Sequence, residues 1–333
     1  MSQTKTFLDL SYHGDIRCIP ESKYTDSMQQ IILPYLEERK KSGYFNSSDK
    51  IRLYYETYLQ KDAIGSIVIS HGFIESIYKY KEVIYYFLQA GYNVFGLDHR
   101  GHGKSYRHVK DKYLIYVENF NDYVSDLNAF ITQIVIPASK EKPLHLYAHS
   151  MGGAIGALYL EQYPDTFQKA VLTSPMMQIH THGVPLPLTK AITGFYNAIG
   201  QGSHYIFTQK KYPPFDCFEN SPSTSRARYE YYMEQCDANE VLQTSAGSFK
   251  WMKEALHGIK NLLLPENLEK IKTPVLLFKS ENDSFVLPDG YDTFVSHAKQ
   301  VCFLDTKDTK HEIFFSENKV LEPYINTIVD FYK

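Results

Sequence analysis

Apolar runs and helical repeats alternate along most of the chain. Strands are predicted where apolar residues run together, and helices where they recur every three or four positions. The predicted strands are 51–59, 66–70, 93–98, 143–148, 169–174, 273–279 and 301–305. The predicted helices are 77–89, 120–135, 151–163, 287–298 and 318–332. Short apolar strands that alternate with helices predict an α/β fold, with a mostly parallel central sheet flanked by helices.

Two segments depart from this alternation. The first is an irregular lead-in, residues 1–45, with one helical pattern between Met28 and Leu36. The second, residues 175–265, is rich in aromatic side chains and has no clear buried strand. The pattern resumes after it, which predicts one mainly helical insertion late in an α/β core. The predicted organisation is an N-terminal extension (1–45), a core (46–174 and 266–333) and a cap or lid (175–265).

The insertion contains one clear amphipathic helix. Thr189 is predicted to cap its N-terminus, and Gly200 to end it. The apolar stripe of this helix is formed by Leu188, Ala191, Ile192, Phe195 and Ile199. That face either packs on the core or touches a membrane. Residues 174–264 carry eight Lys and Arg against seven Asp and Glu, so no strong attraction to anionic lipid is expected.

Charge and composition narrow the class of protein. The net charge is -3, which argues against a nucleic-acid partner, because such proteins carry a basic surplus. No apolar stretch reaches the length of about 18–20 residues that spans a bilayer, and no apolar run near the start predicts a secretory signal. Four scattered cysteines suit a reducing compartment. We expect a cytoplasmic protein, with peripheral contact at the inner face of the membrane left open.

A serine lies where a predicted strand meets a predicted helix. Ser150 stands in LYAHSMGG (146–153), close to the pattern Gly-x-Ser-x-Gly, with Ala148 in place of the first glycine. Small residues are needed there because the sharp turn brings the strand and helix backbones close together. The placement of this motif predicts that Ser150 is a nucleophile.

A serine hydroxyl needs a base to take its proton, and the base needs an acid to orient it. In this kind of site the chain order is Ser, acid, His. His311 is the histidine that follows the last predicted strand, and Asp283 follows the strand 273–279. Glu281 and Asp308 stay open as alternative acids.

A developing oxyanion needs backbone N–H donors. We expect them at Met151, directly after the nucleophile, and at Phe73 in the loop after the strand 66–70. The histidines His180, His182 and His204 lack neighbouring Cys or carboxylate ligands, so no metal site is predicted.

These residues and motifs resemble the α/β-hydrolase superfamily, and within it the bacterial lysophospholipases and the related monoacylglycerol lipases. The resemblance spans roughly 43–332 and is carried by the late Asp283 and His311 and by several segments. These are SGYFNSSDKIRL, SHGFIESIYKY, GLDHRGHGKSYR, VENFNDYVSDL, LYAHSMGGAI, FENSPSTSRARYEYY and SAGSFKWMKEA. The first ~40 residues carry none of these signatures.

The resemblance implies a serine hydrolase with no metal or organic cofactor. It implies cleavage of the acyl ester of a lysophospholipid through an acyl-enzyme, with acyl transfer as a further capacity. Arg226 and Arg228 are candidates to contact the phosphate of such a lipid; the alternative is that both are plain surface charges. The partner expected is therefore a small lipid; no oligomeric state is predicted.

Four other functions stay open from the sequence. A monoacylglycerol lipase or a general carboxylesterase would use the same three residues, and a proline iminopeptidase is a more distant alternative. A lipid-binding protein of the same fold without activity is the alternative of another class. Labelling of Ser150 by a fluorophosphonate distinguishes the enzymes from such an inactive lipid-binding protein.

Overall fold

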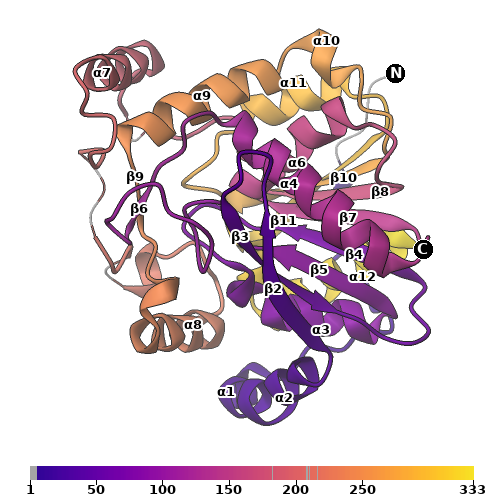
Figure 1. Cartoon of the computed structure of the whole chain (residues 1–333). Helices are drawn as coiled ribbons and strands as arrows, with labels where there is room; N and C mark the ends of the chain where they lie inside the picture. The colour runs from indigo at the N-terminus through magenta and orange to yellow at the C-terminus, as the bar shows by residue number, and fades with distance from the viewer. Residues whose placement is uncertain (1–5, 182, 208, 210, 216) are drawn as a thin grey trace.

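One large sheet forms the centre of the molecule (Figure 1). The computed structural model describes residues 6–181, 183–207, 209, 211–215 and 217–333. The nine strands of the sheet lie in the order β1-β11-β10-β8-β7-β4-β5-β3-β2. In this order, every pair of adjacent strands from β1 at the edge as far as β5 is parallel. The strand β3 pairs antiparallel with both β5 and β2. This is the mostly parallel sheet that the alternating pattern predicted.

Seven of the nine strands of the sheet overlap the predicted apolar runs, while β1 and β2 lie in the segment for which no strand was predicted. The nine strands are β1 (Thr6–Phe7), β2 (Lys40–Asn46), β3 (Arg52–Tyr58), β4 (Gly65–Ser70), β5 (Tyr92–Leu97), β7 (Leu144–His149), β8 (Lys169–Thr173), β10 (Val275–Asn282) and β11 (Val301–Lys310). A separate two-stranded ladder joins β6 (Leu114–Ile115) to β9 (Ala246–Gly247).

The helices lie on both faces of the sheet. The longer ones are α3 (Lys81–Gln89), α4 (Asn121–Phe130), α6 (Met151–Gln162), α7 (Leu186–Ala198), α8 (Arg226–Ala238), α9 (Phe249–Leu262), α11 (Asp289–His297) and α12 (Asn318–Tyr332). The short ones are α1 (Tyr24–Ser27), α2 (Leu33–Glu37), α5 (Ile136–Ser139) and α10 (Pro265–Leu268). The 3-10 turn η3 (Ile77–Tyr80) leads into α3, and π turns prolong α1 and α4 as η2 (Met28–Ile32) and η4 (Ile131–Val135).

Alternation along the strands creates two cores, one on each face. Val68 and Leu146 point into the core shared with α4, α6, α9 and α11. Ile67 and Tyr147, one position away on the same strands, point into the core shared with α3 and α12. Because successive side chains of a strand point to opposite faces, a strand covered on both faces must be apolar throughout.

Residues 6–45 of the predicted N-terminal extension supply a strand to each edge of the sheet. β1 pairs with β11 at one edge of the sheet, while β2 pairs with β3 at the other. Between them the chain is held on α12, where Asn326 exchanges hydrogen bonds of 2.9 Å with both backbone groups of Ile16. The sequence hid this role because β1 has only two residues and β2 is largely polar.

The segment predicted as a cap carries α7, α8 and α9. In Figure 1, α7 and α8 stand to the side of the sheet, whereas α9 runs back over α6. Ala255 and Ile259 of α9 are buried in the same core as α6. α7 begins after Pro185, so Thr189 lies inside the helix and is not its N-cap, and Gly200 follows its end with a positive φ of 77°. In the described part of the chain, the helices are too short or too polar to cross a membrane.

Candidate active site

Ser150 occupies the sharp turn between β7 and α6. Its backbone has φ 52° and ψ -117°, a strained combination that non-glycine residues rarely adopt. The turn is held by hydrogen bonds from Ser150 N–H to the Thr173 carbonyl (3.1 Å) and from Met176 N–H to the Ser150 carbonyl (2.8 Å). A Cβ at Gly152 would collide with carbonyl oxygens at the end of β4, so the glycine permits the close approach. These hydrogen bonds and the close approach at Gly152 therefore hold the serine at the C-terminal edge of the sheet.

Ser150, His311 and Asp283 form one continuous hydrogen-bonded row. Ser150 Oγ lies 2.8 Å from His311 Nε2, and His311 Nδ1 lies 2.7 Å from Asp283 Oδ2. The side chains of His311 and Asp283 are only 8% and 7% exposed. Asp283 Oδ1 accepts the N–H groups of Phe285 and Val286, both at 2.9 Å, which fixes the carboxylate. This geometry can move the serine proton to the imidazole and stabilise the resulting cation.

The charges of this row are mutually supporting. Burial alone would raise the pKa of Asp283, but the His311 imidazole and the backbone donors lower it to about 2. Burial alone would lower the pKa of His311, but the Asp283 carboxylate outweighs it and raises that pKa above its usual value. Asp283 is thus an anion at any physiological pH, ready to hold His311 in one orientation.

The two alternative acids point elsewhere. Glu281 Oε2 accepts the backbone N–H of Asp308 at 3.0 Å, and both residues are exposed. Asp308 Oδ2 lies 3.9 Å from Lys319 Nζ. Asp283 is therefore the carboxylate that the structure places against His311.

The expected oxyanion donors flank the serine. Met151 opens α6, and Phe73 follows β4 in the neighbouring strand-to-helix loop. The Phe73 ring stacks on Trp251 with centroids 3.9 Å apart. Both backbone positions thus lie at the same edge of the sheet as Ser150, where two N–H groups can meet a substrate oxygen.

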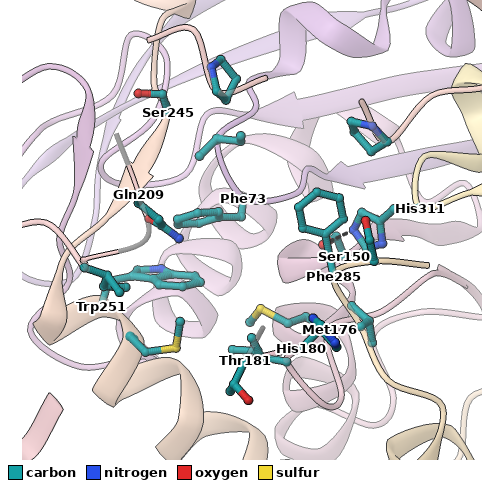
Figure 2. A pocket seen from close by; sticks show the side chains of 18 of the residues that line it. Phe73, Ser150, Met176, His180, Thr181, Gln209, Ser245, Trp251, Phe285 and His311 are labelled. Carbon is teal, nitrogen blue, oxygen red and sulfur yellow. Dashed lines mark hydrogen bonds between the residues drawn. The ribbon is translucent and has the colours of Figure 1, made fainter. Parts of the chain in front are cut away.

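A cavity of about 730 Å³ opens above the serine. Figure 2 shows Ser150, His311 and Phe285 at one side of it and Trp251 with Gln209 at the other. Much of the remaining wall is apolar and comes from the cap segment, including Ile192, Ile206, Phe207, Phe249 and Met252. A mostly apolar cavity with one polar, reactive side suits a substrate with a long hydrocarbon part.

The structure does not bring the two candidate arginines to this cavity. Arg228 is fully buried and makes a two-pronged pair with Glu82, with both N···O distances 2.8 Å. Arg226 is exposed on α8 and pairs with Glu219 and Glu230. Neither lines the cavity, so the expected phosphate contact through Arg228 is corrected: its guanidinium serves an internal ion pair.

Among the residues that the structure describes, no group of three or more His, Cys, Asp or Glu side chains is placed to hold a metal ion. His180 lines the cavity, and His182 lies outside the described residues.

Three buried charged residues beside the site escaped the sequence analysis. Glu75, Lys79 and Glu312 are each less than a tenth exposed, and both glutamates line the cavity. Their signal in the sequence was present, because Glu75 follows Phe73 by two positions and Glu312 directly follows His311.

Solved structures share this fold. A monoacylglycerol lipase from Paleococcus ferrophilus superposes with a TM-score of 0.67 at 21% identity, covering 84% of this chain and 97% of that one. A soluble variant of monoglyceride lipase from Saccharomyces cerevisiae, in complex with a substrate analog, gives a TM-score of 0.69 at 20% identity. It covers 87% of this chain and 93% of the other. The protein has the α/β-hydrolase fold.

Sequence relatives narrow the class. The chain is 30% identical to lysophospholipase L2 of Escherichia coli over 274 residues, 80% of this chain and 79% of that protein. It is 27% identical to a probable lysophospholipase L2 of Haemophilus influenzae, over 90% of this chain and 94% of that one. The family described as serine aminopeptidase, S33, matches residues 61–318, and the chain belongs to it. Within that family, this protein is a hydrolase of carboxylic esters.

Proposed function

We propose that this enzyme cleaves the acyl ester of lysophospholipids through Ser150, His311 and Asp283. The observation that carries the proposal is the hydrogen-bonded row of these three side chains at one side of the apolar cavity. The relatives named lysophospholipase L2, which cover most of the chain, support the choice of substrate class.

The reaction has two halves. Ser150 Oγ attacks the ester carbonyl while His311 Nε2 takes its proton, and the Phe73 and Met151 N–H groups stabilise the tetrahedral oxyanion. His311 then returns the proton to the departing glycerophosphate alcohol, which leaves an acyl-Ser150 ester. Water attacks that ester with His311 again as the base, which releases the fatty acid and restores the hydroxyl.

An ester fits the cavity better than a peptide with a free amine. A peptide amine needs an anionic side chain to pair with it. The two glutamates of the cavity wall, Glu75 and Glu312, already share the Lys79 ammonium. Proline iminopeptidase activity is therefore expected to be absent, and hydrolysis of a prolyl amide by the purified enzyme would contradict this.

The deciding experiment compares two substrates with the same acyl chain. Lysophosphatidylethanolamine and monoacylglycerol are each offered below their micelle concentration, and kcat/KM is measured for both. The proposal requires the lysolipid to be the better substrate. If monoacylglycerol is cleaved about tenfold faster, the enzyme is a monoacylglycerol lipase on the same three residues.

Fluorophosphonate labelling tests the catalytic serine directly. We expect one label per chain, at Ser150, because the row of hydrogen bonds activates that hydroxyl. Ser174, a second buried serine at the same sheet edge, is the control position and should stay unlabelled. A folded protein that takes no label would instead be a silent lipid-binding member of the family.

Acyl transfer follows from the same intermediate. An alcohol that enters the cavity in place of water would take the acyl group from Ser150 and form a new ester. We expect a second lysolipid to act as this acceptor, with the diacyl product detected by mass spectrometry. If free fatty acid is the only product that contains the acyl group, even at high acceptor concentration, acyl transfer is contradicted.

A peripheral membrane contact is proposed through α7. The sequence left open whether the apolar stripe of this helix packs on the core or touches a membrane. Three of its residues, Leu188, Phe195 and Ile199, are 51%, 59% and 52% exposed. Thr189 and Ile192 of the same helix line the cavity, so a lipid leaving the membrane here would have a short path to Ser150. A patch of this kind next to a lipid site suits the surface of a bilayer.

Vesicle sedimentation tests the contact. The variant Phe195→Ser with Ile199→Ser should lose binding to phosphatidylcholine vesicles while still cleaving monomeric substrate. The matched control, Ile64→Ser with Ile136→Ser, removes two equally exposed apolar residues elsewhere. Equal losses in both variants would remove α7 as the contact.

A further inference from the structure

Three buried charges lie directly behind the reacting groups. Glu75 and Lys79 belong to the loop and turn that follow β4, and Glu312 comes after His311 beyond β11. Lys79 Nζ lies 3.2 Å from Glu75 Oε1 and bonds to Glu312 Oε1. The side chains are 3% to 7% exposed, so two carboxylates and one ammonium are buried side by side. Burying such a cluster costs free energy and adds little net stability to the fold. We therefore ask whether it has a role in the reaction.

One oxygen of Glu75 binds the backbone of the oxyanion loop. Glu75 Oε2 accepts the Gly72 N–H at 2.7 Å and the Tyr80 hydroxyl at 2.6 Å. Gly72 directly precedes Phe73, the expected oxyanion donor. A Cβ at Gly72 would lie 2.8 Å from that oxygen and 3.0 Å from His149 Cδ2, so only glycine leaves room for the contact. The carboxylate therefore fixes the peptide that leads into Phe73.

Lys79 keeps Glu75 charged. Burial by itself would raise the pKa of Glu75, but the Lys79 ammonium, aided by the Tyr80 hydroxyl, holds it below its usual value. A hydrogen bond from a backbone N–H to an ionised carboxylate is roughly twice as strong as one to a neutral acceptor. The ion pair thus strengthens the bond that orients the loop.

The same ammonium reaches the loop that carries His311. Its other partner, Glu312, donates its backbone N–H to the Pro222 carbonyl at 3.0 Å, and Pro222 belongs to the cap segment. The ammonium also lies over the rings of Tyr232 and Phe315, at 4.9 and 5.1 Å. Lys79 therefore connects the loop after β4 with the loop after β11, which present the oxyanion donor and the base.

We propose that Glu75 is a positioning residue, which holds the 71–73 turn so that the Phe73 N–H faces the oxyanion formed at Ser150. Lys79 and Glu312 lock Glu75 in place and tie it to the base. This inference rests on the proposed function, since an oxyanion arises only if Ser150 attacks a carbonyl. The hydrogen-bond acceptor, more than the charge, carries the effect.

Two substitutions at one position separate the acceptor from the charge. Glu75→Gln keeps an oxygen for the Gly72 N–H, and Glu75→Leu removes it. Both leave Lys79 paired one to one with Glu312, so the fold is expected to persist. We expect the Gln variant to stay within about fivefold of the wild-type kcat and the Leu variant to lose about 10²-fold, with KM unchanged.

A transition-state analogue gives a readout that a structural role would not move. An alkylboronic acid forms a tetrahedral adduct on Ser150, so its affinity should fall in the Leu variant by the same factor as kcat/KM. Rates are taken per active site titrated with a fluorophosphonate, so partial unfolding does not enter. Glu161→Leu, at a buried glutamate near the far end of α6, is the control and should keep kcat.

Gly72→Ala supplies an independent route if Glu75→Leu fails to fold. The added Cβ pushes the turn off the carboxylate, so the same fall in kcat without a rise in KM is expected. Equal loss in the Gln and Leu variants, or wild-type kcat in the Leu variant, would overturn the proposal. Failure of the proposed function is a separate result, seen when the wild type takes no label at Ser150.

Discussion

Ser150, the proposed nucleophile, has a backbone conformation that non-glycine residues rarely adopt. Its φ is 52°, and backbone hydrogen bonds with Thr173 and Met176 hold the turn in this conformation. Strain of this kind costs about 1–3 kcal/mol and persists only where the surroundings impose it. The surrounding core, which buries Ala148 and Met151 completely, supplies that constraint.

Ser150→Ala tests the nucleophile at this scale. Alanine tolerates the turn as well as serine does, so the melting temperature should hardly change. We expect kcat to fall by about 10⁶-fold, because the triad acts as a unit. Ser66→Ala, which removes a buried hydroxyl from β4, is the control and should leave kcat unchanged. Turnover within tenfold of the wild type would show that another residue is the nucleophile.

The pH dependence of the rate reports on His311. The imidazole must be neutral to accept the serine proton, and its pKa lies above 6.5 because Asp283 outweighs the effect of burial. The rate should therefore rise with pH through an inflection above 6.5 and then level off. Asp283 stays ionised throughout, since its pKa is about 2.

Asp283→Asn provides the comparison. The neutral amide no longer stabilises the imidazolium, so kcat should fall by about 10⁴-fold and the inflection should move to lower pH. The measurement is kcat against pH for both proteins. An inflection at the same pH in wild type and variant would mean that Asp283 is not the orienting acid.

At the scale of elements, Arg228 determines how α8 sits on the core. Its guanidinium joins the cap helix to Glu82 on α3, to Glu21 in the lead-in and to Asn318 at the start of α12. Four segments that are distant in sequence thus meet at one fully buried cation. The part of the cap that carries α8 is thereby held on the core.

Replacement of Arg228 should be strongly destabilising. Arg228→Met leaves Glu82 buried without its partner, and such a loss costs about 3–5 kcal/mol. Arg226→Met, two residues away on the same helix, breaks only exposed pairs and should cost under about 1 kcal/mol. Urea unfolding measures both. Equal, small losses would show that α8 is held by its apolar contacts instead.

The elements that the sequence predicted well are those with a strong local pattern. β4, β5, β7 and β8 are short apolar runs, and each was found within a residue or two. β1 and β2 were missed because an edge strand with few apolar residues owes its shape to its neighbour and not to its own side chains. The start of α7 was misplaced because Pro185, not Thr189, precedes it.

The site divides in the same way. Ser150, His311 and Asp283 could be predicted to lie together because each follows a strand end in a fixed order along the chain, and their side chains are hydrogen-bonded in the structure. Arg228 was misread, since its partner Glu82 lies 146 positions away and nothing local predicts that pair. Glu75 and Lys79 are a local pair, four positions apart, but the second partner of Lys79, Glu312, comes from the other end of the chain and nothing local predicts it.

At the scale of the whole molecule, the cavity lies between the sheet edge and the cap. The sheet edge supplies the reacting groups, and the cap segment supplies much of the apolar wall. The proposed function therefore assigns chemistry and substrate choice to different parts of one chain. A change in the wall should alter which acyl chains are accepted without altering the chemical step.

The dependence on acyl length tests this division. Each buried methylene contributes about 0.8 kcal/mol, so kcat/KM should rise roughly fourfold per methylene from about six to about twelve carbons, where the wall is apolar. Met252 lines the cavity from α9, and Met252→Trp takes up part of its volume. The variant should lose activity on the longest chains and keep it on the shortest.

The control for this variant is Leu256→Met, one helical turn further along α9 and outside the cavity wall. It should keep the wild-type dependence on chain length, because the substitution conserves volume. A Met252→Trp enzyme that is equally slow on all chains would place the damage at the reacting groups. If the lengths that it cleaves well shift downward as a set, the acyl chain occupies the space beneath the cap.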